Sequence, residues 1–150
     1  MRQFRNASNR GATDLGWLDS RHSFAFGRGF PAEGEPLAMG FRSLRVINDD
    51  RVLGGGGFGT HPHDNMEIIS YAVEGALEHK DSTGATETIT AGGFQLTTAG
   101  SGITHSEYNP SPTDPMRFIQ IWIKPAEHNV RPRYQHLNAD DHAAQDGLRL

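Results

Sequence analysis

Residues 56–75 read GGFGTHPHDNMEIISYAVEG. The stretch leaves a glycine-rich segment, places imidazoles at His61 and His63, and continues into an apolar, β-branched run that predicts a strand over 66–75. In extended chain, residues i and i+2 point to the same side, so both imidazoles would face one centre. Glu67 follows His63 by four residues and would share that side, which makes it a candidate oxygen ligand.

A second short pattern, His105-Ser106-Glu107, lies within GGFQLTTAGSGITHSEYN (92–109). It repeats the i, i+2 arrangement with an imidazole and a carboxylate, so two facing strands would offer three nitrogens and one oxygen to a metal. Neutral imidazoles suit iron, nickel, copper, zinc and manganese, and four protein ligands leave open positions on an octahedral metal for substrate or O₂. Spacing alone leaves Glu67 and Glu107 as alternatives for the oxygen ligand.

The rest of the chain is typical of an all-β protein. Glycine and proline, 18 and 8 residues, punctuate the sequence at short intervals, and turn signals every roughly 8–12 residues indicate a sandwich or jelly roll. We expect Phe24 and Phe26 on one face of a short strand, a loop over 27–40, and a mobile or tightly turning connection at the four glycines 54–57. Residues 126–150 are polar and predict a tail or linker. Strands are expected within 17–26, 41–49, 66–75, 76–84, 85–93, 94–100, 102–109 and 116–125.

Bulk composition narrows the class of protein. A chain of 150 residues suits one domain. The chain has no cysteine, which excludes disulfides, thiolate metal sites and a cysteine nucleophile. A net charge of −4 argues against a nucleic-acid partner. Without an apolar run long enough for a signal peptide or membrane span, we expect a soluble cytoplasmic protein. The remaining histidines are read as ordinary side chains, His79 as a hydrogen-bond partner of Asp81: 22, 79, 128, 136 and 142.

These motifs resemble a known family. Residues 56–75 resemble the first cupin motif and 92–109 the second. The order of WLDSRHSFAFG, LRVINDD, the H-P-H stretch, EHKDSTG, TAGSGITHSE and IQIWI is similar to the N-terminal domain of pirins over roughly residues 14–135. The resemblance implies a cupin double-stranded β-helix, a jelly-roll barrel, over 1–135, with a polar tail or truncated linker over 136–150. It also implies His61, His63, His105 and Glu107 as metal ligands. Glu67 would then support the ligands without contacting the metal.

Activity is likewise an implication of this resemblance. Pirin-like proteins typically bind iron, so we expect one Fe(II), with zinc, nickel, copper or manganese as alternatives. Several are quercetin 2,3-dioxygenases: the flavonol 3-hydroxyl would bind the metal as its anion, Glu107 would take the proton, and O₂ would cleave the heterocycle with release of carbon monoxide. The alternative is a non-catalytic metal-binding regulator, a transcription cofactor that acts through protein partners, as monomer or homodimer. Pirins usually carry two cupin domains, so this chain is expected to be a short member or a fragment.

Overall fold

The computed structural model describes residues 6–26, 30–31 and 38–139. Strands dominate this part of the chain, which contains one short 3₁₀ turn and no helix long and apolar enough to cross a membrane. The elements are η1 (Ala7–Asn9), β1 (Gly11–Asp14), β2 (Leu18–His22), β3 (Phe30–Pro31), β4 (Leu44–Val52), β5 (Gly57–His63), β6 (Glu67–Glu74), β7 (Ala76–Asp81), β8 (Thr86–Thr90), β9 (Phe94–Thr98), β10 (Ile103–Tyr108), β11 (Met116–Ile123) and β12 (Arg133–Leu137).

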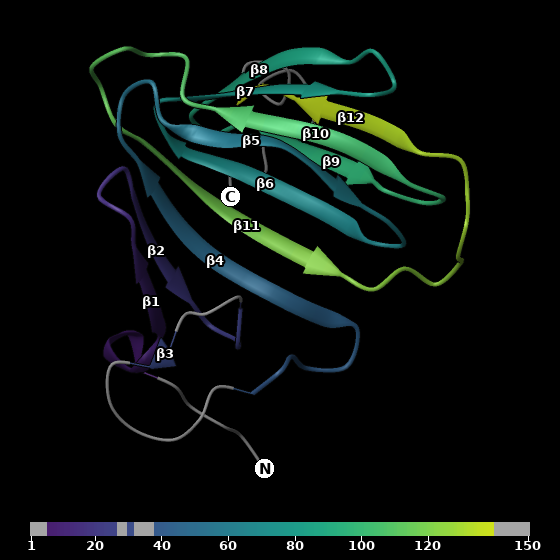
Figure 1. Cartoon of the computed structure of the whole chain (residues 1–150), viewed down its shortest axis with the longest axis horizontal. Helices are drawn as coiled ribbons and strands as arrows, with labels where there is room; N and C mark the ends of the chain where they lie inside the picture. The colour runs from purple at the N-terminus through teal and green to yellow at the C-terminus, as the bar shows by residue number, and fades with distance from the viewer. Residues whose placement is uncertain (1–5, 27–29, 32–37, 140–150) are drawn as a thin grey trace.

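The strands form two antiparallel sheets that face each other (Figure 1). The larger has the order β12-β9-β6-β11-β4-β2-β1-β3, and the smaller has the order β5-β10-β7-β8. The long central pair β4 and β11 pairs over its whole length, since both strands are rich in β-branched residues that fit a pleated surface. The predicted all-β fold is confirmed.

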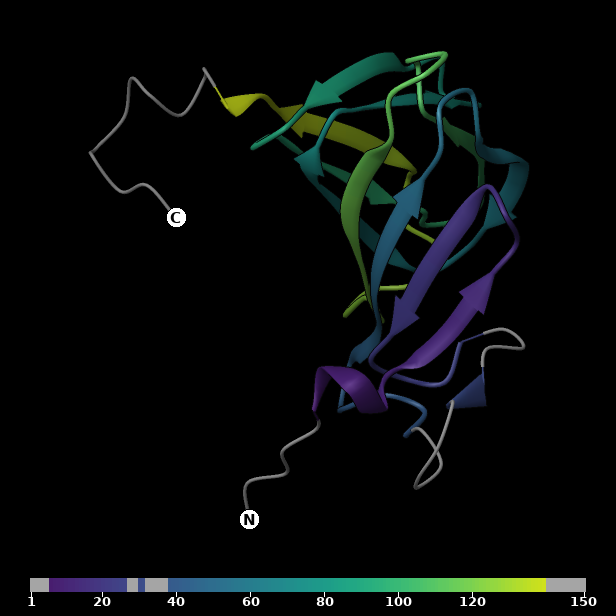
Figure 2. The ribbon, with the colours of Figure 1, turned by 90° about the vertical axis from the view of Figure 1, so that its left-hand side faces the viewer.

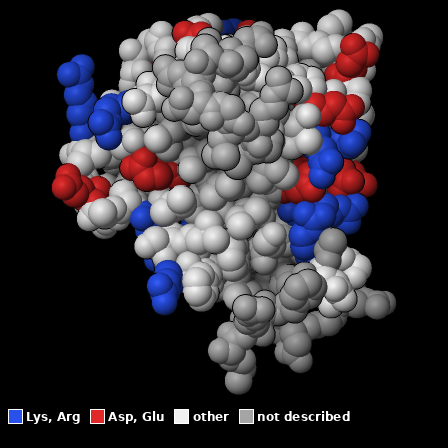
Figure 3. Space-filling model, turned by 180° about the vertical axis from the view of Figure 1, so that it is seen from behind, with Lys and Arg blue, Asp and Glu red and all other residues white. Residues whose placement is uncertain are grey.

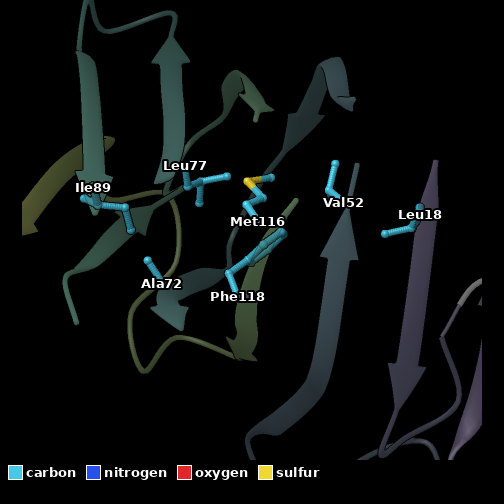
Figure 4. Packing of buried hydrophobic residues seen from close by; sticks show 7 residues of the cluster. All are labelled: Leu18, Val52, Ala72, Leu77, Ile89, Met116 and Phe118. Carbon is cyan, nitrogen blue, oxygen red and sulfur yellow. The ribbon is translucent and has the colours of Figure 1, made fainter. Parts of the chain in front are cut away.

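Buried side chains from both sheets meet in an apolar core (Figure 4). On β6 and β11, inward and outward positions alternate, as expected for strands with one buried face. Phe118, exposed by only 1%, is the largest member of the core, and burying such a side chain contributes about 1.5–3 kcal/mol. Strand residues that pack together here are Leu18, Val52, Ala72, Leu77, Ile89, Met116 and Phe118.

An N-terminal hairpin widens the larger sheet. Strand β2 pairs with β4 in the register that aligns Ser20 with Asp50 and His22 with Asn48, and β1 pairs with the other edge of β2 (Figure 2). The expected strand within 17–26 is shorter than the pattern suggests: β2 ends at His22, and Phe24 and Phe26 lie beyond it. Phe26 instead packs its ring edge-on against Trp122 at 5.3 Å.

Two sequence expectations are corrected by the strand boundaries. The glycine run turns at Gly55, where φ is +71°, but Gly57 already belongs to β5. Glycine is required at this position of the strand because a Cβ there would lie 2.5 Å from the carbonyl oxygen of Glu107 on the paired strand. The polar segment 126–150 is also more than a tail, since β12 pairs with β9 along its length.

Other expectations fall where the structure gives no description. The described residues exclude most of the predicted loop 27–40, and they exclude residues 140–150, which contain His142. The division of the chain at 135–136 stays a prediction.

On the face shown in Figure 3, charges of both signs lie beside one another at the two margins, so the described residues form no continuous basic surface there.

Candidate metal centre

Strands β5 and β10 bring three histidines together. His61 and His63 alternate with the exposed Pro62 at the end of β5, and His105 lies opposite His61. The Nε2 atoms of His61 and His105 are 3.1 Å apart, and the ring of His63 lies 4.8 Å from each of the other two rings. One ring nitrogen from each histidine falls within 4.8 Å of the others. The structure thus clusters these three predicted ligands.

A β-bulge in β5 allows this arrangement. His105 pairs with His61, but Glu107, two residues on, pairs with Phe58, three residues back. The extra residue in β5 lets both Phe58 and His61 line the same cavity, which strict alternation would forbid. Because of the bulge, β5 contributes both an aromatic side chain and two of the three clustered histidines to the cavity wall.

The histidines present nitrogen lone pairs. His61 Nδ1 donates to the carbonyl oxygen of Gly59 at 2.7 Å, so the Nε2 atom is the ring nitrogen that faces His105. His63 Nε2 is buried without a hydrogen-bond partner in the described residues. Burial lowers the pKa of His63 to about 4 and that of His105 to about 3, so both rings are neutral near pH 7. Converging neutral imidazoles with an unsatisfied buried nitrogen fit a divalent transition metal.

Glu107, the predicted fourth ligand, is fully buried and lines the same cavity as His61 and His63. It does not join their nitrogen cluster; its carboxylate groups instead with His105 and His79. Ser70 Oγ at 3.0 Å and Gln95 Nε2 at 2.7 Å donate to Oε1, and Gln120 Nε2 donates to Oε2 at 2.8 Å. Its place as a metal ligand therefore stays a prediction, while its orientation is set by three side-chain donors.

These donors belong to a polar row across the larger sheet. Strand register places the five side chains side by side on β2, β4, β11, β6 and β9, and all are buried: His22, Asn48, Gln120, Ser70 and Gln95. Two further hydrogen bonds orient the side-chain amides of the two glutamines. Trp122 Nε1 donates to Gln120 Oε1 and Tyr134 Oη donates to Gln95 Oε1, each at 3.0 Å. An amide whose oxygen is occupied this way presents its NH₂ group to the carboxylate.

Glu67, the rival oxygen ligand, lies elsewhere. Residues 64–66 separate β5 from β6, so parity counted from His63 does not carry across the break. On β6 the buried positions are Ile68, Ser70 and Ala72, with Glu67 on the opposite parity. Its carboxylate accepts a hydrogen bond from Thr98 at 2.7 Å. The expectation that Glu67 shares the side of His63 is wrong, and no ligand cluster of the described residues includes it.

Two histidines interpreted as ordinary lie close to the site. His79 makes the expected hydrogen bond to Asp81, at 2.8 Å, but it is also fully buried, with its ring 5.3 Å from that of His105 and stacked on Tyr134 at 4.2 Å. His22 is buried at the cavity wall. In the sequence, the i+2 spacing of His79 from Leu77 could have indicated that His79 is buried, because it places both side chains on the inward face of β7.

A cavity of about 510 Å³ opens beside the cluster. Its wall combines His61, His63 and Glu107 with aromatic rings and uncharged polar groups, and its described lining contains no lysine or arginine. Asp50 lies in this wall, where burial raises the pKa of its carboxyl to about 7 despite the hydrogen bond from Ser20, with Glu107 adding to the increase. The arrangement suits an uncharged aromatic ligand beside a metal.

Two facing antiparallel sheets are the architecture of the cupin fold. The solved cupin domain of Cnp3 from Schizosaccharomyces pombe superposes with a TM-score of 0.55 at 11% identity, over 76% of this chain and 68% of that one. More specifically, the model of the Pirin family matches residues 3–123, and the chain belongs to the pirin family.

Relatives and solved structures agree with this assignment. The Escherichia coli K12 protein named quercetin 2,3-dioxygenase is 51% identical over 136 residues, 91% of this chain and 57% of that protein. A Zymomonas mobilis protein named putative quercetin 2,3-dioxygenase is 46% identical over 84% of this chain and 52% of its own length. The structure of bacterial pirin YhhW from Escherichia coli in complex with nickel(II) has a TM-score of 0.82 at 50% identity, over 89% of this chain and 56% of that one. This chain thus spans little more than half the length of these relatives.

Proposed function

We propose that this chain carries the active site of a metal-dependent dioxygenase that cleaves quercetin or a related flavonol with O₂. The observation that carries the proposal is the convergence of three histidines, two of them held neutral by burial, beside a cavity that is lined by aromatic rings and includes His61 and His63 in its wall. The names of the Escherichia coli and Zymomonas mobilis relatives support the substrate class.

The residues present fit a metal. His61, His63 and His105 would hold it, and we propose Glu107 as the fourth ligand because it follows His105 by two residues on β10 and lines the same cavity. Iron(II) is the metal we propose, with zinc, nickel, copper and manganese as alternatives; the nickel(II) complex of YhhW supports a divalent ion in a relative. When bound, such a metal supplies a Lewis acid that polarises an oxygen ligand.

The chain's own residues would bind and orient the substrate. Trp17 and Phe58, in edge contact at 5.4 Å, form one aromatic wall, and Phe26 with Trp122 forms another. A planar flavonol would lie between them and direct its 3-hydroxyl toward the histidines. Glu107 would accept the hydroxyl proton, with its carboxylate oriented by Ser70, Gln95 and Gln120. Addition of O₂ then opens the heterocycle and releases one carbon as carbon monoxide.

The test is an O₂-uptake assay with quercetin on the iron-loaded chain, followed by loss of the flavonol absorbance. We expect uptake by the unmodified chain, and loss of uptake together with bound metal in His63→Ala. His128→Ala is the matched control, since His128 is exposed and lies outside the histidine cluster.

The outcomes separate enzyme from regulator. Stoichiometric metal in the unmodified chain without O₂ uptake would refute the dioxygenase proposal and favour a metal-dependent binding protein. Equal loss of uptake in His63→Ala and His128→Ala would show that the effect is not specific to the histidine cluster.

A further inference from the structure

Polar side chains on β2 and β4 form a patch of the cavity wall that the proposed chemistry does not use. Asp50 and Asn48 occupy alternate inward positions of β4, exposed by 3% and 2%. Ser20 and His22 lie opposite them on β2. All four line the cavity that also contains His61 and His63.

Hydrogen bonds orient these four side chains, but they do not use every donor and acceptor atom of the patch. Ser20 Oγ donates to Asp50 Oδ1, and His22 shares hydrogen bonds of 2.9 Å with Asn48 Oδ1 and with Thr13 Oγ1. Among the described residues, Ser20 is the one hydrogen-bond partner of the Asp50 carboxyl and bonds to Oδ1, and the hydrogen bond of the Asn48 side chain is made by Oδ1, so Asp50 Oδ2 and the Asn48 amide nitrogen remain available. A buried carboxyl that accepts only one hydrogen bond lowers the stability of the fold. A ligand that donates another hydrogen bond to Asp50 would therefore bind more tightly.

The two free groups suit a hydroxyl. A hydroxyl both donates and accepts, so one placed between these two side chains, which share the inward face of β4, can donate to Asp50 and accept from Asn48. Asp50 would accept or share the proton, since burial raises its pKa to about 7, and Asn48 would donate from its amide. Because the described lining contains no lysine or arginine, neither of these residue types would pair with a carboxylate or phosphate group placed at Asp50 and Asn48.

We propose that Asp50 and Asn48 form a hydroxyl-binding subsite, which anchors a second hydroxyl of a planar polyphenol whose first hydroxyl lies at the histidine cluster. This inference rests on the proposed function, because it assigns both anchors to the same ligand. It defines the substrate class more narrowly: an uncharged polyhydroxylated aromatic molecule, in preference to one with a single hydroxyl.

The test measures binding without turnover. Quercetin and 3-hydroxyflavone, which has only the hydroxyl next to the ketone, are titrated under argon into the full metal-loaded chain. Quenching of Trp17 and Trp122, which line the cavity, reports the dissociation constants. We expect quercetin to bind at least about tenfold more tightly, the factor that one good hydrogen bond to a charged or buried group supplies.

Variants assign that preference to the subsite. In Asp50→Leu the preference should fall to about twofold or less through weaker quercetin binding, with metal content unchanged; Asn48→Leu is the second variant and should lower it at least about threefold. Asp49→Leu is the matched control on the same strand, since Asp49 pairs with Arg117 and Arg10 outside the cavity lining, and it should keep the full preference.

Equal binding of the two flavonols by the unmodified chain would overturn the subsite without any variant. A quercetin preference that survives in both Asp50→Leu and Asn48→Leu, or in Asn48→Leu if Asp50→Leu does not fold, would also overturn it. The subsite and the dioxygenase fail separately: an Asp50-dependent preference without O₂ uptake refutes only the enzyme, and O₂ uptake without that preference refutes only the subsite.

Discussion

Replacing Asp50 by asparagine should stabilise the metal-free protein, and the gain should grow with pH. The carboxyl of Asp50 is exposed by 3% in the folded chain, where burial raises its pKa from the ordinary 3.8 to about 7. Between these two values the folded state holds a proton that the unfolded state has lost. The contribution of Asp50 to stability is therefore present below pH 4 and is lost as the pH rises through 7.

The size of the effect follows from the two pKa values. At about 1.4 kcal/mol per pKa unit, Asp50 disfavours folding by about 1.5 kcal/mol at pH 5 and by about 4 kcal/mol at pH 8. Asparagine has no charge to bury and still offers an oxygen to Ser20. The free energy of unfolding of Asp50→Asn, relative to the unmodified chain, should thus rise by about 2.5 kcal/mol between pH 5 and pH 8.

Urea denaturation of both proteins across this pH range, after removal of metal by a chelator, measures that difference. For a chain of this length the same change corresponds to about 8 °C in midpoint temperature. His63 and His105 also titrate, but they are present in both proteins and cancel in the comparison. A stability difference that stays constant with pH, or declines as pH rises, would refute the assignment of Asp50 as a carboxyl destabilised by burial.

Three further substitutions test the support of the site. Gln120→Leu removes the donor to Glu107 Oε2 and the acceptor of Trp122 Nε1, so it should lower the free energy of unfolding in urea by about 1–3 kcal/mol; an unchanged midpoint would contradict the polar row. Gly57→Ala places a Cβ 2.5 Å from the Glu107 carbonyl oxygen, and calorimetric titration should show weaker metal binding as β5 is pushed from β10; unaltered affinity would argue against this close approach. Phe118→Ala empties the core and should cost about 3–5 kcal/mol in thermal unfolding; a loss below about 1 kcal/mol would contradict its packing.

Local patterns, together with the resemblance to the pirin family, were sufficient to predict the histidine cluster. His61 and His63 on one strand, and His105 on another, needed only strand parity and the order of flanking motifs. Parity failed for Glu67 because the count ran across the break at 64–66, where the chain leaves one sheet for the other. Strand boundaries, which periodicity defines poorly, therefore decided which carboxylate lies near the histidines.

The support of Glu107 could not be predicted in the same way. Ser70, Gln95 and Gln120 come from three strands, and only the register of β6, β9 and β11 places them in one row. A glutamine between isoleucines, as in 119–121, looks the same in sequence whether it faces solvent or a buried carboxylate. Strand β12 was missed because RYQHL lacks alternating apolar residues, although pairing with β9 orders it.

Metal content tests the central claim most directly. The chain is stripped with a chelator, exposed to Fe(II) or Ni(II) without O₂, freed of unbound ion and analysed, beside His63→Ala and the control His128→Ala. We predict about one equivalent of metal in the unmodified chain and in His128→Ala, and less than about a tenth in His63→Ala. An unmodified chain that retains less than about a tenth of an equivalent, or a His63→Ala variant that retains as much as the unmodified chain, would contradict a metal centre at His61, His63 and His105.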